Sequence, residues 1–233
     1  MVKLNQIEEN IYEIPQEGQM NKPARVYAND KLLEEIKQDD TLEQIKNVAT
    51  LPGLEKYSIV MPDGHQGYGF PIGGVAAVNK EKGVISPGGI GYDVNCGIRV
   101  LKTDLKYEEV RGREQQLANI LFNKIPCGLG KGGYIDTDRE DLEEILEKGA
   151  EWMLENGHAK ESDLNRCEEN GRLPGNPEKI SEDAKKRGLN QVGSLGSGNH
   201  FMEIQRVGEI YNEEKAEAYG LEEDQVVVMI HSG

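Results

Sequence analysis

Residues 84–100 read VISPGGIGYDVNCGIRV, in which four glycines and a proline lie between two short apolar runs. Glycine is unfavourable inside a helix and the apolar flanks favour strands, so we predict a strand, a tight loop and a second strand. Asp93 and Cys96 stand three positions apart on this loop, where the glycines let a ligand approach the backbone closely. On its own the pair allows two interpretations: a metal or phosphate site, or a turn aspartate beside a cysteine buried as a small hydrophobe.

The composition is that of one folded, soluble unit. With 233 residues and a hydrophobic fraction of 36%, the chain can form a core, and we predict a single domain over residues 1–233. No run approaches the ~18 apolar residues of a membrane span, and the N-terminus lacks the basic start and apolar stretch of a leader. We therefore expect a cytoplasmic protein. Its three cysteines form no CxxC pair, which favours reduced thiols over disulfides.

The formal net charge of −15 argues against a protein that holds nucleic acid through its overall field, because such domains carry a basic face. A nucleic acid would have to be bound locally, and a small basic cluster is present at Lys185, Lys186 and Arg187. Bound divalent cations reverse the local sign of a carboxylate-lined site. The acidic balance therefore does not exclude a substrate that carries phosphate.

The periodicity of apolar residues predicts helices and strands on both sides of the loop. The predicted strands cover residues 7–14, 24–28, 57–61, 73–78, 201–205 and 226–231, and the predicted helices cover 30–36, 40–51, 107–123, 138–156 and 179–187. Asp40, and Asp138 or Thr137, are candidate helix caps. We predict an α+β fold: a mixed β-sheet core with flanking helices and glycine-rich loops that form a metal site. The last strand, apolar on both faces, belongs at the centre of a sheet.

Two further glycine-rich loops follow. Residues 127–134, CGLGKGGY, do not satisfy the GxxxxGK[ST] spacing of a phosphate-binding loop, so we interpret them as a flexible connector. Residues 191–200, QVGSLGSGNH, open directly onto the strand 201–205 and put His200 at the junction. His231 stands at the C-terminal end of the last predicted strand, so both histidines lie where ligands are commonly bound.

Asp93, Cys96, His200 and His231 together offer one carboxylate, one thiolate and two imidazoles, which suits a divalent transition metal. Each histidine alone is more often structural than a ligand. As a set, with glycine loops before three of the four residues, they favour a metal site. The S and N donors favour zinc or iron, whereas a bridging carboxylate and phosphate oxygens would admit manganese.

Four motifs carry a resemblance to a known family. They are PDGHQGYGFPIGGVAA at residues 62–77, GYDVNCGIR at 91–99, GSGNHF at 196–201 and HSG at 231–233. In this order they resemble the RtcB family of RNA-splicing ligases, and the resemblance spans residues 57–233. Each motif is long and unusual, so the match is far more specific than a short glycine pattern.

The resemblance implies a GTP- and manganese-dependent RNA ligase. Such an enzyme joins RNA ending in a 2′,3′-cyclic phosphate or a 3′-phosphate to RNA with a 5′-hydroxyl, in tRNA splicing and RNA repair. It implies RNA and GTP as partners, together with an archease-type activating protein. The metal ligands that the resemblance implies are Asp93, Cys96, His200 and His231, with Cys96 bridging two manganese ions.

The nucleotide site that the resemblance implies is the run 199–203, made of Asn199, His200, Phe201, Met202 and Glu203. By the resemblance, Asn199 contacts phosphate and Glu203 accepts hydrogen bonds from the guanine edge. A carboxylate that accepts two N–H groups selects guanine over adenine.

The sequence departs from the family pattern after His231. Family members carry a further metal-binding histidine and a nucleophilic histidine that becomes guanylylated, and no histidine follows His231 here. We therefore assign no catalytic residue and expect the N-terminal half of a ligase, an incomplete RtcB-like fold truncated after the strand ending at His231 and inactive alone. Two alternatives stay open: a metal-dependent phosphoesterase that uses the same four ligands, and a binding module without metal.

Overall fold

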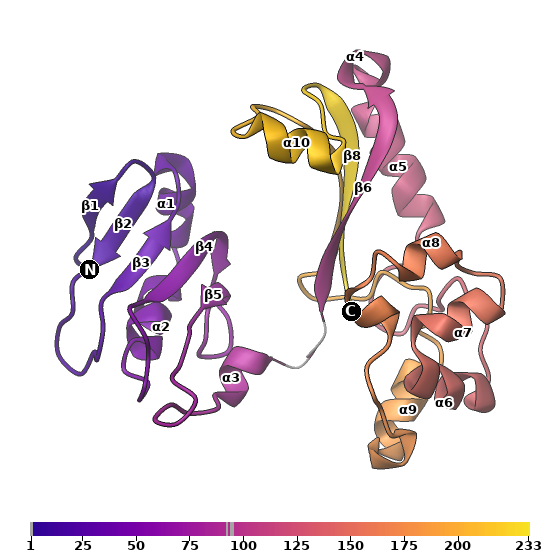
Figure 1. Ribbon diagram of the computed structural model, residues 1–233, viewed down its shortest axis with the longest axis horizontal. Helices are drawn as coiled ribbons and strands as arrows, with labels where there is room; N and C mark the ends of the chain where they lie inside the picture. Colours follow the sequence, from indigo (N-terminus) through magenta and orange to yellow (C-terminus); the bar gives the residue numbers. More distant parts are fainter. Residues whose placement is uncertain (1, 92, 94–95) are drawn as a thin grey trace. The chain divides into compact units, whose positions relative to one another are not determined.

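The computed structural model describes residues 2–91, 93 and 96–233 and shows a mixed α+β protein (Figure 1). The chain divides into two compact units, an N-terminal unit of residues 1–94 and a C-terminal unit of residues 95–233. The sheet of the first unit has mixed strand directions and that of the second is antiparallel. The single domain expected over residues 1–233 stays a prediction. Among the described residues, no helix combines the length and the apolar composition needed to cross a membrane.

The N-terminal unit is a five-stranded sheet with helices packed on it (Figure 1). Its elements are β1 (Asn5–Glu8), β2 (Ile11–Ile14), β3 (Ala24–Tyr27), α1 (Asp30–Ile36), α2 (Thr41–Val48), β4 (Ser58–His65), β5 (Ile72–Val75) and α3 (Pro87–Ile90). The strand order is β1-β2-β3-β4-β5, with β3 parallel to β4 and the other neighbours antiparallel. Sheet and helices both contribute fully buried side chains: Ile14, Val26, Ile36, Ile45 and Val60.

Three strand predictions in this unit were wrong in detail. The strand predicted over 7–14 is a hairpin, because the chain turns at Asn10, whose φ is +60°. The predicted strand 73–78 occupies Ile72–Val75 instead. Residues 84–85 form no strand, and Pro87 begins the helical turn α3, because proline presets the φ of a first helical position.

The loop that follows β4 is held against α2. The strand predicted over 57–61 runs on to His65, and the Gln44 side chain of α2 then pairs with the backbone of Gly67. The amide nitrogen of Gln44 donates to the Gly67 carbonyl at 2.8 Å, and its oxygen accepts from the Gly67 N–H at 2.9 Å. This double hydrogen bond fixes the start of the glycine-rich motif that follows the strand.

Asp39 anchors the same loop from the N-terminal end of α2. Its carboxylate accepts from the Thr41 N–H at 2.9 Å and from the Gln66 N–H at 2.8 Å. The predicted cap Asp40 makes no capping hydrogen bond through its side chain. The acceptor is therefore one residue earlier than predicted, because Asp39 satisfies both a free helical N–H and the loop.

The hydrogen bonds of Asp39 predict a pH-dependent stability of this unit. Burial raises the pKa of its carboxyl, but hydrogen bonds from Thr41 and Gln66 outweigh burial and lower the pKa below the ordinary value of 3.8. A carboxyl with a lowered folded-state pKa stabilises the fold above its unfolded pKa, and this stabilisation is lost as the pH falls. We expect amide exchange in α2 and β4 to accelerate as the pH falls below about 4.

The control for this pH dependence is the neighbouring Asp40. Asp39→Asn should flatten the loss of protection on acidification, whereas Asp40→Asn should retain it, because Asp40 makes no capping bond. Amide hydrogen exchange, corrected for the intrinsic pH dependence, measures both variants. An Asp39→Asn protein that loses protection as steeply as the wild type would contradict the assignment.

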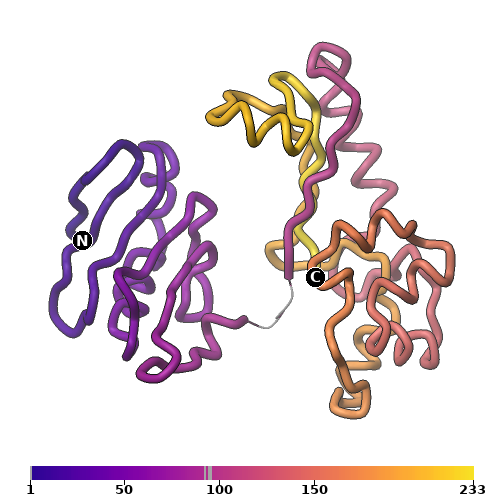
Figure 2. Tube along the Cα trace, viewed as in Figure 1, coloured from indigo at the N-terminus to yellow at the C-terminus, as the bar shows by residue number. Residues whose placement is uncertain are grey.

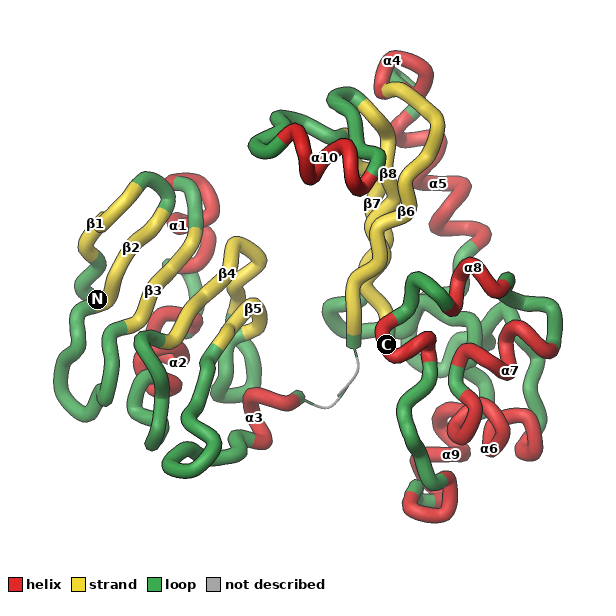
Figure 3. Tube along the Cα trace, viewed as in Figure 1, coloured by secondary structure: helices red, strands yellow, loops and turns green. Residues whose placement is uncertain are grey.

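The C-terminal unit is built on a three-stranded antiparallel sheet of order β6-β8-β7 (Figure 3). Its elements are β6 (Gly97–Lys106), α4 (Tyr107–Val110), α5 (Glu114–Lys124), α6 (Arg139–Lys148), α7 (Ala150–Glu155), α8 (Glu161–Leu164), η1 (Glu168–Gly171), η2 (Pro177–Lys179), α9 (Glu182–Gly188), β7 (Phe201–Arg206), α10 (Glu213–Tyr219) and β8 (Gln225–Ser232). The apolar strand β8 is central, as its sequence predicted, and runs beside β6 along the trace in Figure 2.

The two long helices predicted in this unit are each interrupted by a glycine. The helix predicted over 107–123 breaks into α4 and α5 around Gly112, whose φ is +78°. The helix predicted over 138–156 breaks at Gly149, with a φ of +62°. The predicted cap Asp138 is confirmed, because its carboxylate accepts from the N–H groups of Glu140 and Asp141 at 2.8 and 3.0 Å.

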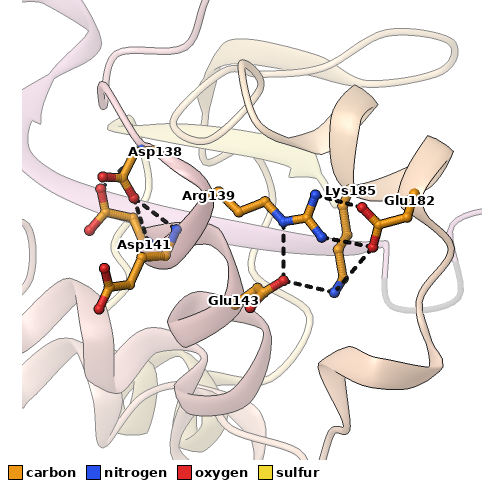
Figure 4. Close-up of polar contacts among 7 residues, drawn as sticks. Asp138, Arg139, Asp141, Glu143, Glu182 and Lys185 are labelled. Atoms are coloured by element: carbon orange, nitrogen blue, oxygen red, sulfur yellow. Dashed lines mark hydrogen bonds and ion pairs between the residues drawn. The ribbon is translucent and has the colours of Figure 1, made fainter.

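An ion-pair network joins α6 to α9 (Figure 4). The Lys185 side chain is buried, and its Nζ lies 2.9 Å from a carboxylate oxygen of Glu143. Arg139 reaches Glu143 at 3.1 Å and Glu182 at 2.6 Å. Hydrogen bonds from Lys185 and then from Arg139 lower the pKa of Glu143. Lys185 is thus committed to internal pairing, so the basic cluster predicted to meet nucleic acid loses this residue.

Candidate metal centre

The sheet of the C-terminal unit brings three predicted ligands to one edge. In the antiparallel register, His231 of β8 pairs with Ile98 of β6 on one side and with Phe201 of β7 on the other. The strands β6 and β7 therefore begin where β8 ends. Cys96 and His200, which directly precede these strands, consequently lie beside His231.

The side chains of Cys96, His200 and His231 form a compact cluster. The Sγ atom of Cys96 lies 2.8 Å from His231 Nε2 and 3.2 Å from His200 Nε2, and all three donor atoms lie within 4.8 Å of one another. The ring centroids of His200 and His231 are 5.4 Å apart. The rings of Phe201 and His231 meet edge to face, with their centroids 5.3 Å apart. The three side chains are half-buried, so the cluster is sheltered and still accessible.

A backbone carbonyl sets the orientation of His200. The Nδ1 atom of His200 lies 2.8 Å from the Leu195 carbonyl oxygen. Because a carbonyl only accepts, the proton of the neutral ring is on Nδ1, and the lone pair of Nε2 points toward Cys96. A metal-binding histidine commonly has this arrangement, with its second nitrogen bonded to a carbonyl or carboxylate.

The donor set fits a divalent transition metal. Donors bound at ~2.0–2.3 Å to one tetrahedral ion lie ~3.5 Å apart, so a small outward movement of the Cys96 and His231 side chains would admit an ion. A thiolate and two imidazoles are typical ligands of zinc, iron or cobalt, and manganese accepts them when oxygen ligands complete its shell. Three protein donors leave coordination positions for a fourth ligand or a substrate.

The fourth predicted ligand belongs to the other compact unit. Asp93 lies in the N-terminal unit, whereas Cys96 lies in the C-terminal unit. That Asp93 binds the same ion as Cys96, and that Cys96 bridges two ions, therefore stay predictions. Of the remaining histidines, His158 stacks on Trp152 with ring centroids 6.1 Å apart, which accounts for it structurally.

The predicted nucleotide run, residues 199–203, divides between two faces of the sheet. Phe201 and Glu203 alternate onto the face that carries His231, and the Glu203 carboxylate accepts from the Gln205 side chain at 2.7 Å. Met202 lies on the opposite face, where it lines a cavity of about 470 Å³ beneath α5. Asn199 is exposed just before the strand. Glu203 therefore lies on the face of the sheet that carries His231, and the Met202 side chain lies on the other face.

The glycine loop of residues 127–134, predicted to be a flexible connector, is instead paired with the loop that precedes His200. Residues 126–135 run beside residues 190–196, and backbone hydrogen bonds join the two segments at five points. They are Leu195 N–H to Pro126 O (2.8 Å), Gly128 N–H to Gly196 O (2.8 Å), Gly133 N–H to Asn190 O (2.9 Å), Tyr134 N–H to Gly193 O (3.1 Å) and Ile135 N–H to Val192 O (3.4 Å). The prediction missed this role because pairing between two irregular segments leaves no periodic signal.

The fold and the donor set together define a mixed α+β protein with a candidate transition-metal centre at the edge of an antiparallel sheet. Residues 44–233 match the family described as tRNA-splicing ligase RtcB. Because this match covers most of the sequence, the chain belongs to the RtcB family of tRNA-splicing ligases.

Curated relatives extend the match to the whole chain. It is 55% identical to a tRNA-splicing ligase RtcB of Thermococcus kodakarensis, across 100% of this chain and 49% of that protein. It is 50% identical to a protein of the same name from Aeropyrum pernix, across 100% of this chain and 50% of that protein. It is 47% identical to a protein of the same name from Nanoarchaeum equitans, across 100% of this chain and 49% of that protein. The chain thus spans about half the length of the curated relatives it matches.

Proposed function

We propose that this chain supplies the metal centre and part of the nucleotide site of a GTP- and manganese-dependent RNA ligase. The proposed reaction joins a 2′,3′-cyclic phosphate or 3′-phosphate RNA end to a 5′-hydroxyl RNA end. The observation that carries the proposal is the convergence of Cys96, His200 and His231 within 4.8 Å, in a chain of the tRNA-splicing ligase family. The proposed setting is cytoplasmic, with RNA as substrate and an archease-type activating protein as partner.

The residues of the chain have distinct proposed roles. In this proposal Cys96, His200 and His231 would hold manganese, Asp93 would be a further ligand, and Cys96 would be the ligand shared by two ions. A metal ion bound there would supply positive charge that stabilises phosphate groups. The hydrogen bond from His200 Nδ1 to the Leu195 carbonyl oxygen keeps the Nε2 lone pair available to a metal.

The nucleotide is proposed to bind on the sheet face that carries His231. Glu203 is exposed on this face, and its carboxylate can accept two N–H groups of a guanine edge. Ile98 and Val100 are about half exposed on the same face, which leaves room beside the metal cluster in this unit. Asn199 is proposed to donate its amide N–H to a phosphate oxygen. Phe201 and Met202 are proposed to act through packing. Phe201 packs against His231, and Met202 packs on the opposite face of the sheet, where it lines the cavity.

The proposal assigns the guanylylated nucleophile to a histidine outside residues 1–233. The purified chain alone should bind Mn²⁺ and neither become labelled by radioactive GTP nor seal RNA. When it is mixed with the part of the Thermococcus kodakarensis protein that lies outside the match, we expect sealing of 3′-phosphate RNA to 5′-hydroxyl RNA. Cys96→Ala in this chain should abolish that sealing.

Three results would contradict parts of this proposal. Labelling of the isolated chain by GTP would show that a nucleophile lies within residues 1–233. Hydrolysis of a generic phosphodiester by the isolated chain, lost in Cys96→Ala, would favour a metal-dependent phosphoesterase. Failure to bind any divalent metal would leave a binding module without metal chemistry.

A further inference from the structure

The Leu195 carbonyl is a junction between the two segments that carry the metal histidines. It accepts from His200 Nδ1 at 2.8 Å and from the Ser232 hydroxyl at 3.1 Å. Ser232 directly follows His231 at the end of β8. One carbonyl oxygen therefore links the loop that carries His200 to the strand that carries His231.

The Leu195 peptide is itself fixed from its other side. Its N–H donates to the Pro126 carbonyl at 2.8 Å, and the carbonyl of Gly196 accepts from the Gly128 N–H at 2.8 Å. Gly196 has a φ of +88°, and a Cβ atom there would overlap His200 Nδ1. The backbone conformation that only glycine adopts easily thus gives the imidazole its space beside the carbonyl.

Ser232 is placed to assist the metal site without competing for the metal. Successive side chains of a strand point to opposite faces, so the hydroxyl of Ser232 and the imidazole of His231 leave β8 in opposite directions. The hydroxyl has a carbonyl partner at 3.1 Å and is half-buried. Its effect on the cluster therefore passes through Leu195 and His200.

We propose that Ser232 is a positioning residue that holds the Leu195 carbonyl in place and thereby fixes the tautomer and direction of His200. This inference rests on the proposed metal centre. Loss of the hydroxyl frees the loop to move away from β8 and loosens the hydrogen bond that keeps the proton on His200 Nδ1. Groups that orient a metal ligand in this way typically change metal affinity by ~10–100-fold when they are removed.

The test compares Ser232→Thr with Ser232→Val in the full chain, because these side chains have the same shape and only threonine keeps the hydroxyl. We expect Ser232→Thr to bind Mn²⁺ like the wild type and Ser232→Val to bind ~10–100-fold more weakly. Trp152, the single tryptophan of the chain, is buried in this unit. Its fluorescence therefore reports whether each variant is folded.

A second readout does not depend on metal. Imidazole ¹H–¹⁵N spectra of the metal-free chain at one pH should show the proton of neutral His200 on Nδ1 in the wild type and in Ser232→Thr. In Ser232→Val the Nδ1 and Nε2 tautomers should mix. Equal tautomer populations and equal affinities in the two variants would overturn the inference. If neither the wild type nor the two variants bind metal, but the tautomer of His200 still changes only in Ser232→Val, the positioning role stands and the proposed function fails.

Discussion

Replacing Cys96 with alanine is expected to lower the affinity of the chain for Mn²⁺ by about 10²-fold. Four-donor zinc sites bind with ~10–16 kcal/mol, so one donor accounts for ~2.5–4 kcal/mol, or about 10²–10³-fold. Because manganese prefers oxygen donors, we expect its loss of affinity to lie at the lower end of this range. The thiolate has the largest effect because its sulfur is the atom that contacts both His200 and His231.

Electron paramagnetic resonance of unbound Mn²⁺ measures this change. Cys167→Ser is the matched control, because Cys167 lies in the same unit and its thiol contacts Arg99 and the Asp163 carbonyl instead of the cluster. The control should bind Mn²⁺ like the wild type. Equal weakening in both variants would mean that the thiol of Cys96 is not a ligand.

Gly133→Ala is expected to have the largest effect on the stability of the C-terminal unit. A Cβ atom at Gly133 would overlap the Val192 carbonyl oxygen, which is a backbone atom and cannot rotate away. The two paired glycine loops must then separate, at a cost of roughly 3 kcal/mol, the upper end for overpacked sites. Because the loop of Val192 continues to Leu195 and His200, metal affinity should fall as well.

Gly132→Ala is the matched control for this prediction. A Cβ atom at Gly132 meets nothing within 4 Å, so this neighbouring substitution should leave stability close to that of the wild type. Urea unfolding followed by the fluorescence of Trp152 measures the C-terminal unit selectively, since the chain has one tryptophan. Equal unfolding free energies for the two variants would show that the loops are not packed together as described.

The parts of the site that depend on local pattern were predictable from the sequence. Residues 226–230 are apolar on both faces, and the strand they form is central. The glycine loop before His200 predicted a histidine at a strand edge, and the contacts of Cys96 with His200 and His231 confirm that these three residues meet. The α+β class followed from the same alternation of helical and extended patterns.

The parts that depend on tertiary contacts were not predictable in this way. The Leu195 carbonyl is a backbone group, so nothing in the residue type predicts that it orients His200. The pairing of the two glycine loops depends on register between distant segments. Gly112 and Gly149 break helices whose apolar periodicity continues through them, because the φ adopted by a glycine is decided by packing.

The absorption spectrum of the Co²⁺-loaded chain tests the central claim most directly, that Cys96, His200 and His231 form a metal centre. Cobalt accepts the same donors and shows a thiolate-to-metal charge-transfer band only when sulfur is bound. We predict a saturable band in the wild type and in Cys167→Ser, and its disappearance in Cys96→Ala. A wild-type chain without the band, or a band that persists in Cys96→Ala, would contradict the account.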